Sequence, residues 1–262
     1  MTTPMTGVLT DHQAAVARDF VLARERERDH LVVYLSGAHA YGFPSPDSDL
    51  DLKCVHVAPT RELVGLVPYE EPKDTIEIVD GVELDYGSNE LGGVLRGCIK
   101  GNGNYLERIL GKLVVGGRGE LLAEARAVVA PLVSRRVGRH YGGFARSQLE
   151  LFDAKPTAKR ALYVLRTTAT GRHLLATGEL VTDLTQLPQY APAGLDELLA
   201  IKQRAEQEQL TDEQRVRWRE HLVAAIAAVD DAWPTSVLPV DPPEPALAAA
   251  DAWLRDVRHR HW

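Results

Sequence analysis

The 262-residue chain contains little cysteine and no long run of apolar residues. Its two cysteines, Cys54 and Cys98, stand beside apolar residues. This setting predicts small core side chains in a reducing compartment and argues against a disulfide or a cysteine metal site. No apolar stretch approaches the roughly 20 residues that a membrane span requires. Because residues 1–10 have neither a basic start nor an apolar core, we expect no signal peptide and a cytoplasmic protein.

The chain also lacks an excess of positive charge. Its 30 Lys and Arg residues against 37 Asp and Glu residues give a formal net charge of −7. A protein that coats nucleic acid by general electrostatics needs many basic contacts to phosphate, so the net charge argues against this class. Basic residues do gather between Ser134 and Arg172, where a triphosphate or an RNA end could be received, or where a helix face is simply solvated. Within this segment Lys159 and Arg166 stand two helical turns apart and share a face.

The most informative stretch runs from Leu31 to Lys53 and combines an apolar strand, a glycine-bearing turn and two aspartates one residue apart. In a strand, residues i and i+2 point to the same side, so Asp49 and Asp51 present two carboxylates to one face. Such carboxylates repel each other unless a cation neutralises them. Mg²⁺ prefers oxygen ligands and usually combines one or two carboxylates with substrate phosphates. The aspartate pair therefore predicts half of a metal–triphosphate site.

The turn that follows the apolar strand predicts the other half. Gly37 allows a close approach of the backbone, and residues 38–41 can open a helix whose free N–H groups face a phosphate. An Asp-x-Asp pair alone is weak evidence, because a solvated acidic edge carries the same pattern by chance. Its coupling to the preceding strand and glycine turn favours the metal–triphosphate interpretation.

These residues resemble the signature of the nucleotidyltransferases of the DNA polymerase beta type. The segments Gly37-Ala-His-Ala-Tyr-Gly42 and Ser48-Asp-Leu-Asp51 are similar to the Gly-Ser-x-Ala-Tyr-Gly and Ser-Asp-x-Asp motifs of a bacterial and phage branch of predicted nucleotidyltransferases. That branch includes RNA-repair-associated polymerase-beta-like proteins. Softer similarity continues to the late part of the chain, at Lys100-Gly-Asn-Gly-Asn104, Leu106-Glu107, Lys159–Arg166, Leu174–Leu180 and Ser236–Pro239.

The resemblance implies a set of site residues. Strand alternation alone leaves Glu83 and Asp85 as equal candidates for a third carboxylate, and the family pattern places it on Asp85. The implied catalytic and metal-binding residues are then Asp49, Asp51 and Asp85. Expected contacts to the nucleotide phosphates come from Gly37, Ala38, Ser48, Lys159 and Arg166. Ala38 stands where the family usually has serine, whose hydroxyl contacts the triphosphate.

The implied reaction transfers a nucleoside monophosphate from a nucleoside triphosphate to an acceptor hydroxyl, with Mg²⁺ or Mn²⁺ as cofactor. Asp49 and Asp51 would hold metal at the triphosphate, and Asp85 would hold a second metal that favours loss of the acceptor proton. The leading acceptor is an RNA or tRNA end in RNA repair. Transfer to a protein or small molecule, and a non-catalytic nucleotide or RNA binder, stay open. Retention of three closely placed aspartates favours an enzyme.

The periodicity of apolar residues and the positions of capping residues, prolines and glycines predict an α+β protein. We expect a small mixed β-sheet nucleotidyltransferase lobe with flanking helices over residues 1–118, then a mostly helical C-terminal lobe over residues 119–262. A capping box at Thr10 should open a helix to about Glu27, and Asp80-Gly81 should join two strands as a hairpin. Further helices are expected over Leu91–Ile99, Leu121–Gly138 and Tyr141–Phe152, from Thr157, from Thr211 to about Trp233, and over Ala246–Arg258.

Overall fold

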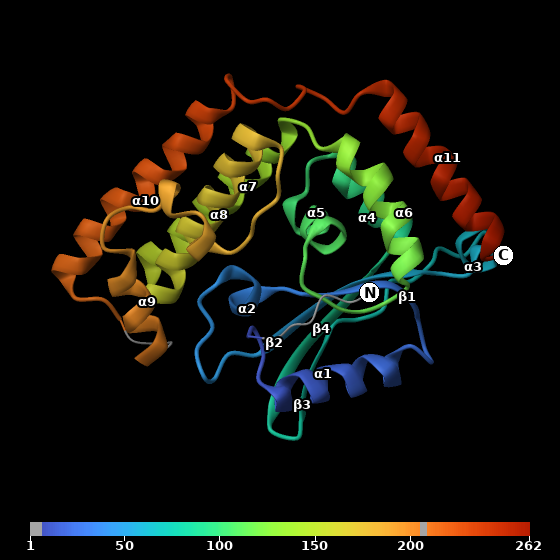
Figure 1. Ribbon diagram of the computed structural model, residues 1–262, viewed down its shortest axis with the longest axis horizontal. Helices are drawn as coiled ribbons and strands as arrows, with labels where there is room; N and C mark the ends of the chain where they lie inside the picture. The colour runs from blue at the N-terminus through green and yellow to red at the C-terminus, as the bar shows by residue number, and fades with distance from the viewer. Residues whose placement is uncertain (1–6, 205–208) are drawn as a thin grey trace. The chain divides into compact units, whose positions relative to one another are not determined.

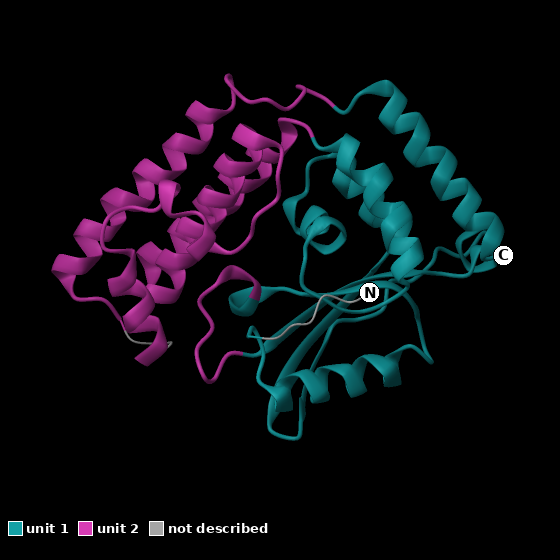
Figure 2. Cartoon of the chain, in the orientation of Figure 1, with its two compact units in different colours: residues 1–39, 49–133, 242–262 teal, residues 40–48, 134–241 magenta. Residues whose placement is uncertain are grey.

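The computed structural model, which describes residues 7–204 and 209–262, has the α+β architecture expected from the sequence (Figure 1). Residues 1–6, part of the segment considered above for a signal peptide, lie outside the described residues. Contacts divide the chain into two compact units (Figure 2). Unit 1 comprises residues 1–39, 49–133 and 242–262, and unit 2 comprises residues 40–48 and 134–241. The division into domains at residue 118 stays a prediction.

Unit 1 is built on a mixed five-stranded sheet with the order β3-β4-β2-β1-β5. In chain order the strands are β1 (Asp29–Leu35), β2 (Leu50–Val57), β3 (Thr75–Val79), β4 (Val82–Glu90) and β5 (Val114–Gly116). The central strands β2 and β4 run parallel, and every other neighbouring pair is antiparallel. The sheet therefore brings the start of β2 beside the first half of β4.

Helices cover both faces of this sheet (Figure 1). Helix α1 (Asp11–Arg24) begins with the expected capping box at Thr10 and ends slightly before the predicted residue. Its buried Phe20 and Val21 join a core with strand residues such as Leu52 and Tyr86. The other face carries α4 (Leu91–Ile99), α5 (Gly103–Leu110) and α6 (Gly119–Val129), while the short α3 (Thr60–Leu63) follows β2. Apolar side chains on both sides thus fix the orientation of the strands.

The expected hairpin joins β3 to β4. Asp80 has φ 48° and Gly81 has φ 78°. Two successive left-handed residues characterise the type I′ turn, whose twist matches that of paired strands and which Asp-Gly sequences favour. The turn sets the β3–β4 register, in which Ile76 pairs with Asp85.

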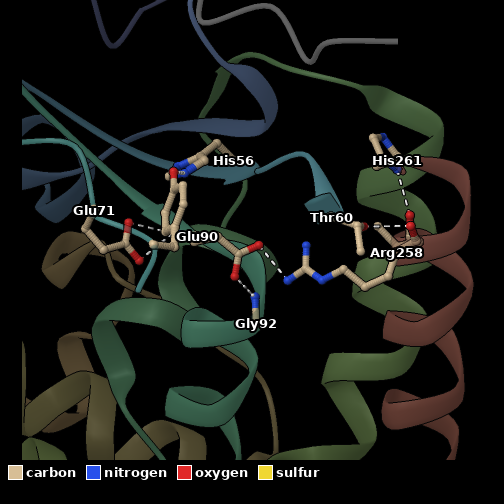
Figure 3. Close-up of polar contacts among 9 residues, drawn as sticks. His56, Thr60, Glu71, Glu90, Gly92, Arg258 and His261 are labelled. Carbon is tan, nitrogen blue, oxygen red and sulfur yellow. Dashed lines mark hydrogen bonds and ion pairs between the residues drawn. The ribbon is translucent and has the colours of Figure 1, made fainter. Parts of the chain in front are cut away.

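The last helix, α11 (Glu244–Arg260), returns to unit 1 and is held there by polar contacts (Figure 3). Arg258 forms an ion pair of 2.6 Å with Glu90, whose carboxylate also accepts a hydrogen bond from the Gly92 N–H at the start of α4. The Thr60 hydroxyl donates to the Arg258 carbonyl at 2.7 Å. The Thr60 N–H donates to the carbonyl of His261. These contacts join α11 to β4, α3 and α4.

Unit 2 is mainly helical. It contains α7 (Arg136–Ala154), α8 (Ala158–Thr177), α9 (Leu195–Arg204) and α10 (Asp212–Ala232), of which α7, α8 and α10 pack together. Thr157 caps α8, and Thr211 forms a capping box with Gln214 at the start of α10, as predicted.

The prediction of a single helix over Leu121–Gly138 is wrong. Helix α6 ends at Val129, a 3₁₀ turn covers Ala130–Leu132, and α7 begins only at Arg136. Pro131 explains the break, since proline removes a backbone donor and its ring clashes with the preceding helical turn.

Both cysteines are free and buried, as the sequence predicts. Burial raises the pKa of the Cys54 and Cys98 thiols to about 12, so both are protonated at neutral pH. Among the described residues, no helix combines the length and apolarity needed to cross a membrane.

Candidate metal and nucleotide site

Three aspartates of unit 1 meet where β2 begins beside β4. Asp49 stands directly before β2, Asp51 lies in β2, and Asp85 lies in β4. In the parallel register Asp51 pairs with Asp85. One carboxylate oxygen from each residue lies within 4.8 Å of the other two, and all three residues are partly buried. The structure therefore brings together the carboxylates that the sequence analysis selected.

The register also separates Asp85 from Glu83. Both lie on the face of β4 opposite the buried Leu84 and Tyr86. Both have a partner on the outer strand β3, but only Asp85 also has a partner on β2, namely Asp51, and Glu83 is exposed. Strand alternation could not make this distinction, because it says which face a side chain occupies and not which neighbour it meets.

Lys53 is a member of this site that the sequence analysis missed. Its Nζ lies 2.6 Å from Asp85 Oδ1 and 4.0 Å from Asp51 Oδ1. The signal was available, since residue 53 is two positions beyond Asp51 and must share its face of the strand. The residue opposite Lys53 in the register is Gly87, which presents no side chain.

Gly37 is the residue that lets the turn and the aspartates approach. It begins the short helix α2 (Gly37–Tyr41) with φ +65°, a left-handed conformation that glycine adopts without strain. A Cβ atom at this position would overlap the Asp51 carboxylate. The preceding Ser36 N–H donates to the Asp51 carbonyl at 2.8 Å. The carboxylate of Asp51 thus packs directly against the glycine, with the buried Ala38 next in sequence.

The three carboxylates suit a divalent cation. Oxygen donors are the ligands that Mg²⁺ and Mn²⁺ prefer, and carboxylates this close repel one another without a cation. Among the described residues, these aspartates are the one cluster of at least three acidic, histidine or cysteine side chains close enough to share a metal ion. The donor set therefore fits the expected cofactor.

The remaining predicted site residues belong to unit 2. Ser48 is buried; its hydroxyl accepts a hydrogen bond from the Ser45 N–H at 2.9 Å and lies 3.5 Å from Lys202 Nζ. Lys202 is itself buried and donates to the Ser45 hydroxyl at 2.5 Å. These hydrogen bonds restrain the loop that precedes Asp49. The expected contact of Ser48 with phosphate stays a prediction.

Lys159 and Arg166 lie on α8, as their spacing predicts. Arg166 is buried, and its guanidinium carbon lies 3.3 Å from the centre of the Tyr41 ring. Tyr41 also makes an edge contact with Tyr163, at 5.8 Å between ring centres. Tyr41, four residues after Gly37, therefore packs on α8 within unit 2. A role for Lys159 and Arg166 in binding phosphate stays a prediction.

Comparison with known proteins gives a family match over most of the chain. The family described as RlaP, RNA repair pathway DNA polymerase beta family, matches residues 15–256. An uncharacterized protein of Methanocaldococcus jannaschii, MJ0002, is 26% identical over 159 residues, which cover 59% of this chain and 64% of that protein. A nucleotidyltransferase-like protein from Exiguobacterium sibiricum aligns with a TM-score of 0.35 and 10% identity, over 85% of this chain and 75% of its own.

Proposed function

Because the chain belongs to the RNA repair pathway DNA polymerase beta family, we propose that it is a metal-dependent nucleotidyltransferase acting on an RNA or tRNA end. The observation that carries this proposal is the group formed by Asp49, Asp51 and Asp85 where β2 begins beside β4. Three carboxylates at this separation repel one another, and the single ammonium of Lys53 beside them balances only part of their charge. The choice of an RNA acceptor is supported by the description of the family.

Each carboxylate has a role in this proposal. Asp49 and Asp51 would hold a metal ion at the triphosphate, and Asp85 would hold one beside the acceptor hydroxyl. When bound, such ions neutralise phosphate charge and make the hydroxyl more acidic. The backbone at Gly37 and Ala38, the Ser48 hydroxyl, and the Lys159 and Arg166 side chains would orient the phosphates.

The transfer forms a bond between the acceptor oxygen and the α-phosphorus. The bond between the α-phosphorus and the oxygen that bridges to the β-phosphorus breaks, pyrophosphate leaves, and the acceptor proton passes to solvent. The protein contributes chiefly by holding the reacting groups in line, since positioning and charge stabilisation dominate phosphoryl-transfer catalysis.

The test incubates the purified protein with each of the four α-labelled nucleoside triphosphates, first with Mg²⁺ and then with Mn²⁺. Total tRNA is added either intact or cleaved to leave 3′ hydroxyls, because a repair enzyme is expected to favour broken ends. The variant Asp49→Asn/Asp51→Asn removes two ligands. Glu83→Gln is the matched control, since it neutralises a carboxylate on the same sheet face outside the aspartate group.

Label in RNA that disappears in the double variant and persists in Glu83→Gln would support the proposal. Label in the protein itself would identify a protein acceptor, and the RNA assignment would be wrong. Transfer that persists unchanged in Asp49→Asn/Asp51→Asn would remove these aspartates from the mechanism. The absence of label in RNA and in protein with either ion would point to a different acceptor or to a nucleotide or RNA binder without catalytic activity.

A further inference from the structure

A cationic side chain already lies among the three carboxylates. The Lys53 ammonium contacts Asp85 at 2.6 Å and stands 4.0 Å from Asp51. The exposed fractions of the three side chains are 21% for Lys53, 28% for Asp85 and 20% for Asp51. Water therefore screens this ion pair less than it screens a pair on the open surface.

The strand register places Lys53 within reach of both aspartates. Lys53 lies in the middle of the sheet, between β1 and β4, and shares the face of Asp51. Its register partner on β4 is Gly87, and Asp85 lies two residues earlier on the same face of that strand. Asp74 packs against the same glycine, so that a Cβ at Gly87 would come within 2.7 Å of its Oδ1 atom. Acidic side chains thus border this part of the face on more than one side.

We propose that Lys53 is a positioning residue that competes with divalent cations for Asp85 and so makes the two metal positions of the site unequal. This inference rests on the proposed function. The Asp49–Asp51 end has the weaker contact with the ammonium and accepts an ion at low concentration. Asp85 can ligate an ion only after Lys53 releases it, so this position fills at a higher ion concentration.

Charge supports the same ordering. Together, the three carboxylates and the Lys53 ammonium have a net negative charge that a single divalent ion balances. A second divalent ion would have to bind Asp85 beside the Lys53 ammonium, and these two positive charges repel each other. The lysine stem is flexible and its ammonium is a compact point charge, so Lys53 can exchange Asp85 for another acceptor without movement of the strand.

The test measures Mn²⁺ binding to the full chain without nucleotide, by the loss of the electron paramagnetic resonance signal of the free ion. Wild type should bind one ion clearly more tightly than a second. Lys53→Met keeps the apolar stem and removes the charge, and it should strengthen the weaker position by about tenfold, the effect of losing one partly shielded ion pair. Lys53→Arg keeps the positive charge, so it should keep the difference in Mn²⁺ affinity between the two positions. Lys112→Met removes one exposed positive charge elsewhere in unit 1 and should behave as wild type.

Unchanged binding at both positions in Lys53→Met would overturn the competition while leaving the metal site and the proposed function intact. If wild type binds no Mn²⁺, or if Asp49→Asn/Asp51→Asn binds it as wild type does, the metal site fails and the inference falls with it. Circular dichroism checks that each variant folds, and Lys53→Gln replaces Lys53→Met if the latter does not.

Discussion

Gly37 lets the Asp51 carboxylate approach the turn because glycine has no Cβ atom. In Gly37→Ala the new Cβ would overlap the Asp51 carboxylate, and alanine would have to adopt a left-handed φ of +65°. We expect a folded protein that is less stable by about 1–2 kcal/mol and binds Mn²⁺ at least about tenfold more weakly. Urea unfolding and Mn²⁺ titration measure the two effects.

The matched control is Gly81→Ala. Gly81 also has a positive φ, of 78°, but a Cβ there meets no atom within 4 Å. It should therefore lose a similar amount of stability and keep its Mn²⁺ affinity. Equal losses of affinity in the two variants would show that Gly37 acts through backbone strain and not through its contact with Asp51.

Single residues of the site were predictable where local spacing decides the outcome. Asp49 and Asp51 follow from the i, i+2 rule, and the structure groups them with Asp85. The choice of Asp85 needed the family pattern, because the pairing of β4 with β2 depends on residues far apart in the chain. Lys53 was missed although its position shares the face of Asp51, because the pattern of a divalent-cation site consists of acidic residues only.

Helix α11 shows how one buried charge pair can fix an element. Arg258 and Glu90 have side chains that are 18% and 7% exposed, and Arg258→Met would leave the Glu90 carboxylate without its guanidinium (Figure 3). Removal of one partner from a buried pair costs about 3 kcal/mol or more, because the remaining charge stays desolvated. We expect this loss in the free energy of unfolding measured in urea.

Arg255→Met is the control on the same helix. Arg255 pairs with Asp251 one turn earlier, and these side chains are 75% and 61% exposed, so the loss should stay below about 0.5 kcal/mol. In the double variant Arg258→Met/Glu90→Gln the uncompensated charge is gone, and part of the stability should return. A loss in Arg258→Met as small as that in Arg255→Met would contradict the assigned role of the pair.

Elements were predictable where their ends carry chemical signals. The capping boxes at Thr10 and Thr211 and the Asp80-Gly81 turn lie where the sequence placed them. The break near Pro131 was missed because the apolar periodicity of α6 continues into α7 and outweighed a single proline in the interpretation. The docking of α11 beside α3 could not be inferred, since it brings Thr60 to Arg258 across most of the chain.

At the scale of the whole molecule, two buried histidines should make stability depend on pH. Burial, with a smaller contribution from the nearby charge of Arg28, lowers the pKa of His30 and of His56 from 6.5 to about 4. Both are hydrogen-bonded, His30 to the Tyr86 hydroxyl and His56 to Ser88 and Tyr69. In the unfolded chain they take up protons below about pH 6.5, whereas in the folded protein they stay neutral until about pH 4.

The unfolded state therefore binds more protons between these values, and the free energy of unfolding should fall as the pH drops from 6.5 to 4. The limit is about 3 kcal/mol for each histidine. Urea unfolding at a series of pH values measures the slope. His30→Gln/His56→Gln should flatten this part of the profile, whereas His259→Gln, at an exposed position of α11, should leave it unchanged. An equal slope in both variants would assign the dependence to other groups.

The class of the whole molecule was predictable, because strand alternation dominates the first part of the chain and helical periodicity the second. The grouping of contacts was not, since it depends on which distant segments pack together. Residues 40–48 group with the helices of unit 2, and residues 242–262 return to unit 1. No local sequence pattern in either segment predicts the unit with which it packs.

The chain passes between the two units four times, at residues 39/40, 48/49, 133/134 and 241/242. Two of these passages enclose residues 40–48, whose Tyr41 and Phe43 pack on Tyr163. A chimera that exchanged residues 134–241 alone between two members of the family would give these aromatic rings a foreign partner. The interchangeable module is therefore discontinuous, and a recombinant intended to graft a new helical unit onto the aspartate site must carry residues 40–48 with it.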